Sequence, residues 1–162
     1  AAIQQGRIDA GMTTDPAATQ LVASGQGKVL IDMREPGPTA RVLGGVYPAS
    51  SLYMPNAWVD SHKDEVQKLA NAFVKTMKYI HTHSAQEIAD HMPKDYYGGD
   101  KSMYVKSLEA SLPCFTADGR MPQGGPETVL QVLATFKPAV KAAHIDLSKT
   151  YTSACVDGAN KQ

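Results

Sequence analysis

The side chains best suited to ligand binding are three consecutive polar residues, Thr13, Thr14 and Asp15, and one arginine, Arg34. Hydroxyl and carboxylate groups exchange hydrogen bonds with a ligand, and a guanidinium can hold a carboxylate or sulfonate through two parallel bonds. These residues stand at or just after the ends of short apolar runs. We therefore expect a small-ligand site here. The alternatives for Arg34 are a solvated loop residue or a partner of a neighbouring acid.

The pattern around these residues predicts the elements that position them. The runs 8–13 and 28–33 are short and apolar, which indicates buried strands. Asp15 followed by proline predicts a helix over 17–23, because proline fits the first helical position and aspartate is a good N-cap. Strand, helix, strand suggests a parallel pair, and ligands, anions above all, bind where such strands end and the helix begins. An α/β unit without a ligand fits the same pattern.

The middle of the chain contains a predicted hinge at Gly44-Gly45. The stretch 46–59 that follows is aromatic and β-branched, but Pro48 and Pro55 interrupt it. Because proline cannot donate a ladder hydrogen bond, we expect an edge or crossing strand that connects two lobes.

From Ser61 onward the chain reads as helical. Ser61 with Asp64 resembles a capping box and precedes a broad apolar face at helical spacing. Its members are Val66, Leu69, Ala70, Phe73, Val74, Met77 and Ile80. Further helices are expected from Ser84 to before Pro93, from Asp100 to Pro113, and over 124–136, 138–143 and 148–156.

Composition excludes several classes of protein. The chain has 162 residues, 43% of them hydrophobic, so a packed core is expected. Lys and Arg number 16, as do Asp and Glu, and this neutrality argues against a nucleic-acid surface. No apolar run reaches membrane-spanning length. Cys114 and Cys155 could form one disulfide or remain two small side chains.

No catalytic, metal or cofactor site is predicted. His81, His83 and His91 lack a zinc-binding motif and are expected to be exposed polar residues. Cys114 stands in no nucleophile motif, and the glycines at Gly124 lack the lysine and serine of a phosphate loop.

Five segments resemble the C-terminal half of periplasmic substrate-binding proteins of ABC transporters, of the nitrate/sulfonate/taurine or NMT1-like type. They are 1–17 (AAIQQGRIDAGMTTDPA), 29–34 (VLIDMR), 44–54 (GGVYPASSLYM), 66–93 (VQKLANAFVKTMKYIHTHSAQEIADHMP) and 145–152 (IDLSKTYT).

The resemblance implies an α/β fold, namely a partial type II periplasmic-binding fold of two α/β lobes joined by a hinge, with a mostly helical C-terminal part. Residues 1–44 would belong to the second lobe, and 45–162 would supply the return strand and the helices of the first. The strand–helix turn with Thr13, Thr14 and Asp15 would face the ligand cleft, and we extend this expectation to Arg34.

The implied function is an extracytoplasmic solute-binding component of an ABC importer rather than an enzyme. It would be periplasmic, or extracytoplasmic and lipid-anchored, and would deliver a small, anionic ligand to a transporter permease. Sulfonates, nitrate, carboxylates and pyrimidine precursors remain open. The alternatives are an enzyme resembling pyrimidine-precursor synthases of the same fold, and a sensory module without ligand.

The family's N-terminal half has no counterpart in the sequence. Because the predicted strands would then lack neighbours, their apolar edges would be exposed. We therefore expect the N-terminal half of the same protein, or a second copy of the chain, as a partner.

Overall fold

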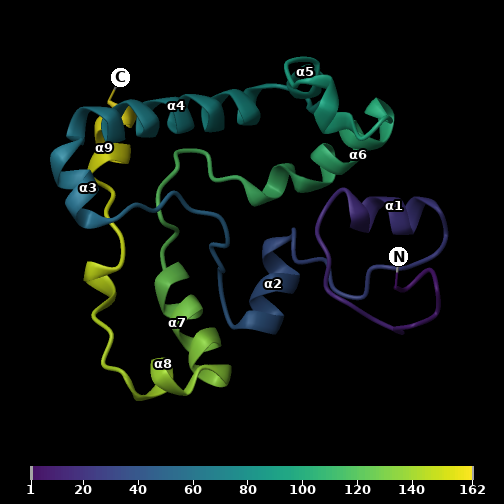
Figure 1. Cartoon of the computed structure of the whole chain (residues 1–162), viewed down its shortest axis with the longest axis horizontal. Helices are drawn as coiled ribbons and strands as arrows, with labels where there is room; N and C mark the ends of the chain where they lie inside the picture. Colours follow the sequence, from purple (N-terminus) through teal and green to yellow (C-terminus); the bar gives the residue numbers. More distant parts are fainter. Residues whose placement is uncertain (1, 162) are drawn as a thin grey trace. The chain divides into compact units, whose positions relative to one another are not determined.

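The computed structural model describes residues 2–161, which contain helices and no strand (Figure 1). The α-helices are α1 Ala17–Ala23, α2 Pro36–Leu43, α3 Asn56–Ser61, α4 Lys63–Thr82, α5 Ala85–Asp90, α6 Lys101–Ser111, α7 Gly125–Phe136, α8 Pro138–Ala142 and α9 Ala154–Asn160. The short 3-10 helices are η1 Lys94–Tyr97, η2 Leu112–Cys114 and η3 Leu147–Lys149. The predicted α/β fold of the periplasmic-binding type is therefore wrong for this chain. Every regular element within residues 2–161 is a helix, and irregular segments join the helices.

The error lies in the three predicted strands. Residues 8–13 and 28–33 are non-helical and form no ladder, and the stretch 46–59 is irregular up to Pro55, after which α3 begins. An apolar run predicts a strand only if another strand pairs its backbone N–H and C=O groups. Within residues 2–161 no segment does so.

The chain divides into two compact units, each made of two segments. Unit 1 comprises Ala1–Arg34 and Ile80–Phe115, and unit 2 comprises Glu35–Tyr79 and Thr116–Gln162. The Gly44-Gly45 pair lies inside unit 2. The predicted hinge at this pair, between a lobe that contains 1–44 and one that contains 45–162, stays a prediction.

The two glycines have separate local roles. Gly44 has φ +88°, in the left-handed region, and its N–H closes the end of α2 on the carbonyl of Ala40. At Gly45 an added Cβ would lie 2.5 Å from the Thr128 hydroxyl oxygen of α7. The pair therefore ends one helix and allows the backbone to approach another.

The predicted long helix is confirmed as α4, but its buried face is narrower than expected. Val66, Ala70 and Val74 are buried at intervals of four residues, whereas Leu69 and Phe73 are 39% and 49% exposed. In unit 2 the side chain of Gln67 donates to the Cys155 carbonyl at 2.9 Å, which joins α4 to α9 (Figure 1).

Helix starts with a side-chain cap were predicted well. The capping box of α5 is confirmed: Ser84 Oγ accepts from the N–H of Glu87 at 3.2 Å, and a Glu87 carboxylate oxygen accepts from the Ser84 N–H at 2.8 Å. Asp100 caps α6 by accepting from Met103 N–H at 2.9 Å. The box predicted at Ser61 is wrong, because this residue ends α3 and its hydroxyl donates to carbonyls of that helix.

Other boundaries differ from the prediction. No helix was expected over residues 36–43, yet they form α2. Pro36 and Pro38 are tolerated because they fall in its first turn, where no intrahelical N–H is needed. The helix expected over 148–156 is instead η3 followed by α9. The predicted helix over 17–23 is confirmed as α1.

Candidate functional site

An ion network in unit 1 joins Arg34 to two aspartates. Arg34 Nη1 lies 2.8 Å from a carboxylate oxygen of Asp15, and Arg34 Nη2 lies 2.6 Å from Asp32. Arg34 Nε also donates to Asp32 at 2.8 Å. The structure thus brings together two of the predicted site residues, Asp15 and Arg34, and it pairs the arginine with Asp32, as the alternative interpretation of the sequence had it.

Asp15 also joins this network to α1 and α6. Its Oδ1 accepts from the Thr19 hydroxyl at 2.6 Å and from the Thr19 N–H at 3.2 Å, and its Oδ2 accepts from the Ser111 hydroxyl at 3.2 Å. The first turn of α1 is therefore stabilised by a carboxylate of the chain itself, so this helix end does not need an external anion.

The network changes the ionisation of its members. Partial burial of Asp15 opposes its charge, but the hydrogen bonds from Thr19 and Arg34 outweigh this and lower its pKa. The guanidinium of Arg34 lowers the pKa of Asp32. Reciprocally, hydrogen bonding to Asp32 and then to Asp15 raises the pKa of Arg34 above its usual value. At neutral pH the network holds two negative charges against one positive charge.

The two threonines of the predicted site are placed differently from Asp15. Both Thr13 and Thr14 are exposed. Thr13 lines a hollow of about 250 Å³ on the other side of α1, with Ile8 and Met12. Thr14 contributes its carbonyl to the start of α1, accepting from Ala18 N–H at 3.2 Å. The structure therefore does not bring the threonine side chains to Arg34.

A second hollow, of about 230 Å³, opens beside Arg34. Its polar lining residues are Arg34, Thr19 and Lys106, and its apolar ones are Ala18, Val22, Ala23, Val29 and Ala110. We call it the Arg34 hollow. Because Arg34 is already paired with two carboxylates, Lys106 is the lining cation that carries no ion pair among the described residues. The hollow can accept a small molecule with an apolar body and one negative charge.

The chain is similar to a protein of known structure. No protein-family model and no curated protein matches the sequence. A solved structure of a protein from Bordetella bronchiseptica RB50 is similar, with 36% sequence identity and a TM-score of 0.90. The match covers 99% of this chain and 50% of the Bordetella chain, so the present chain spans half the length of that protein.

Sequence reasoning missed Lys106 and Ser111, which reach the site from α6. Nothing marks either residue locally, since both lie on a helix far along the sequence from Asp15. Position 111 meets position 15 only because α6 packs near α1 within unit 1. A signal from paired substitutions in related sequences could have found them; spacing within one sequence could not.

Neither the histidines nor Cys155 line the Arg34 hollow, whereas the Cys114 thiol lies against the ion network and donates to the Arg34 carbonyl, with Sγ and O 3.7 Å apart. The rings of His81 and His91 each lie within hydrogen-bond distance of a backbone carbonyl, at 3.1 and 2.9 Å. Within residues 2–161 no three side chains are grouped as metal ligands. Cys114 and Cys155 are free thiols, and partial burial raises the pKa of Cys114.

The chain also has no helix, among residues 2–161, that is both long and apolar enough to cross a membrane. The predicted periplasmic or extracytoplasmic location stays a prediction.

Proposed function

We propose that the chain belongs to an extracytoplasmic solute-binding component of an ABC importer and binds a small organic anion at the Arg34 hollow. The proposal rests on the five sequence segments that resemble such proteins and on the composition of this hollow. A periplasmic location and delivery of the ligand to a transporter permease are parts of the same proposal.

The single observation that carries the ligand class is the lining of the Arg34 hollow, where Lys106 is a cation without an ion pair among the described residues. Arg34, by contrast, is paired with Asp15 and Asp32 at 2.8 and 2.6 Å. An arginine held in this way is fixed in position but is not free to clamp a second anion in a bidentate fork. Attraction for an anion then falls to Lys106 at the edge of the hollow, whose other walls are mostly alanine and valine.

Apolar walls select against a bare inorganic anion. Nitrate would lose hydration against alanine and valine side chains without regaining hydrogen bonds there. An alkyl sulfonate or carboxylate would place its chain against these walls and its charged group near Lys106. We therefore expect organic anions to bind more tightly than nitrate.

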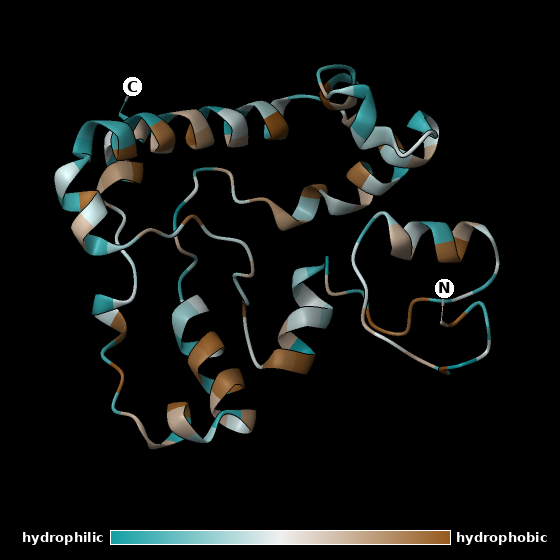
Figure 2. Ribbon diagram, in the orientation of Figure 1, coloured by the Kyte–Doolittle hydropathy of each residue, from teal (hydrophilic) through white to brown (hydrophobic). Residues whose placement is uncertain are grey.

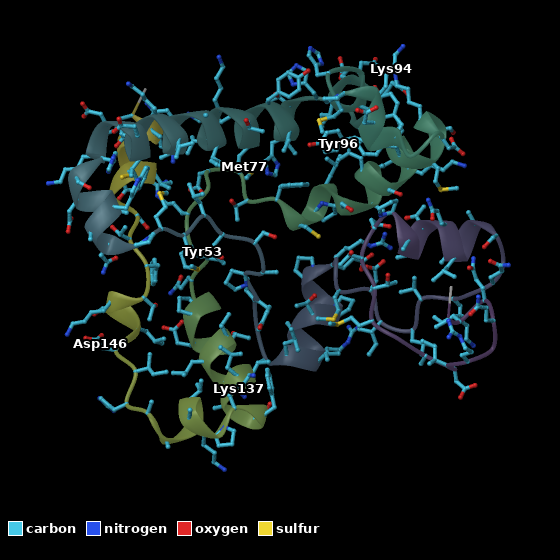
Figure 3. All side chains as sticks on the ribbon, in the orientation of Figure 1. Tyr53, Met77, Lys94, Tyr96, Lys137 and Asp146 are labelled. Atoms are coloured by element: carbon cyan, nitrogen blue, oxygen red, sulfur yellow. The ribbon has the colours of Figure 1, made fainter. Side chains whose placement is uncertain are left out.

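The test is isothermal titration calorimetry of the full chain with nitrate, an alkyl sulfonate and an alkyl carboxylate. Replacing the cation (Lys106→Met) should weaken binding of the organic anions about tenfold. The matched control is Lys94→Met, because Lys94 lies on η1 and does not line the hollow (Figure 3). Equal losses in both variants, or no heat with any of the three anions, would reject the proposal.

A further inference from the structure

The apolar side chains around α1 are unusually exposed. Met12 is 92% exposed, Leu30 is 72% exposed and Ile31 is 52% exposed. α1 itself, although mostly alanine, leucine and valine, contains no buried residue. Figure 2 shows hydrophobic stretches on the non-helical trace beside α1 as well as on the helix. Unit 1 therefore exposes apolar side chains on α1 and on the segments 8–13 and 28–32, and we call these three segments together the α1 face.

The backbone of this face also lacks partners. No backbone–backbone hydrogen bond of the described chain engages residues 8–13 or 28–32. Two extended or irregular segments thus offer N–H and C=O groups together with exposed apolar side chains. Such segments are templates for a further segment of extended chain, whose backbone groups would pair with theirs.

We propose that the α1 face is the docking surface for a companion polypeptide, equivalent to the half of the Bordetella chain that this sequence does not match. The companion would lay extended, apolar chain along residues 8–13 and 28–32 and cover Met12, Leu30 and Ile31.

The length of the solved relative identifies this occupant. The Bordetella chain is twice as long as the part matched by 99% of the present sequence. Its unmatched half is therefore as large as the whole of this chain, enough to cover the α1 face. A second copy of this chain would bring the same surface, with the same exposed side chains and unpaired segments, rather than a complementary one.

The first arm of the test mixes the full 162-residue chain with the unmatched half of the Bordetella protein, made as a separate polypeptide. Size-exclusion chromatography with light scattering should give a one-to-one complex. Hydrogen–deuterium exchange should slow at 8–13 and 28–32 when the companion is added. A complex that protects other residues instead, a dimer of the present chain alone, or no complex would overturn the inference.

The second arm uses a matched pair of charge substitutions. Leu30→Asp places a charge on the α1 face and should weaken the complex at least tenfold. Tyr53→Asp changes a residue of unit 2 that is 89% exposed and should leave affinity unchanged (Figure 3). Since both side chains already face solvent, neither change should unfold the chain. Equal weakening by both would also overturn the inference.

This inference stands apart from the proposed anion site, and the variants separate the two. Lys106→Met should lower anion affinity and leave companion binding intact. Failure of anion binding with an intact complex would reject only the proposed function, whereas anion binding without a complex would reject only the docking surface.

Discussion

Replacing Asp15 by asparagine is the sharpest test of the ion network in unit 1. The amide is nearly the same size as the carboxylate, but one of its two polar atoms becomes a donor. In the native chain Oδ1 accepts from Thr19, while Oδ2 accepts from Arg34 at 2.8 Å and from Ser111 at 3.2 Å. Whichever way the amide turns, its NH₂ group will face another donor.

The loss of stability in Asp15→Asn depends on the burial of the ion pair and on the hydrogen bonds that Arg34 keeps. The Asp15 side chain is only 11% exposed, and that of Arg34 is 25% exposed, so water cannot fully replace the lost acceptor. A hydrogen bond to a charged group contributes roughly 1.5–3 kcal/mol. Because Arg34 keeps its bonds to Asp32, we expect a loss of about 2 kcal/mol, which is about a thirtyfold change in the opening equilibrium of this region.

Native-state hydrogen exchange measures that opening directly. Exchange of α1 amides in Asp15→Asn should be about thirtyfold faster than in the native chain, under conditions where closing outpaces exchange. The control is Asp157→Asn in unit 2, where Asp157 accepts from Arg120 but its side chain is 47% exposed. This control should leave α1 exchange unchanged. If Asp15→Asn also left it unchanged, the network would have no role in holding α1.

Three further results are expected. The pKa values of Asp15 and Asp32 are lower in the folded chain than in the unfolded chain, so the unfolded state binds more protons at acidic pH. Unit 1 should therefore lose stability as pH falls below about 4, which circular dichroism measured against pH will show. Gly45→Ala would force Cβ against Thr128 and should cost roughly 1–3 kcal/mol in urea unfolding, whereas Gly37→Ala, with nothing within 4 Å, should cost little; equal losses would contradict this reasoning. Ser84→Ala removes a helix cap and should cost roughly 0.5–2 kcal/mol, but Ser107→Ala, at a buried hydroxyl without a partner, should be neutral or stabilising in thermal unfolding.

Helices whose signals are local could be predicted from the sequence. Ser84 and Glu87 satisfy the first N–H groups of α5 within four residues of chain, so the pattern is sufficient by itself. Likewise Gly124-Gly125-Pro126 marks the start of α7, which the structure confirms at Gly125. In both cases the groups that stabilise the element are sequence neighbours.

The predicted strands were wrong because a strand, unlike a capped helix, depends on groups that are distant in the sequence. The run 28–33 has the apolar composition of a buried strand, but a strand forms only when another segment supplies its hydrogen bonds. Val29, Leu30 and Ile31 are instead 45%, 72% and 52% exposed. The composition was read correctly as apolar, but residues 2–161 contain no segment whose backbone pairs with this run.

Two of the four predicted site residues are neighbours in the structure, but their electrostatics could not be predicted. Asp15 and Arg34 were both expected at the ends of the predicted strands, and although no strand forms, their side chains meet at 2.8 Å. The sequence left open whether the guanidinium binds a ligand or pairs with a neighbouring acid. In the structure Asp15 and Asp32 hold it, and their two negative charges exceed its one positive charge. An anion approaching Arg34 therefore meets a network with a net negative charge, so tight binding requires a second cation. Only Lys106 of the lining residues offers one, and its substitution is the measurement on which the proposed ligand class depends.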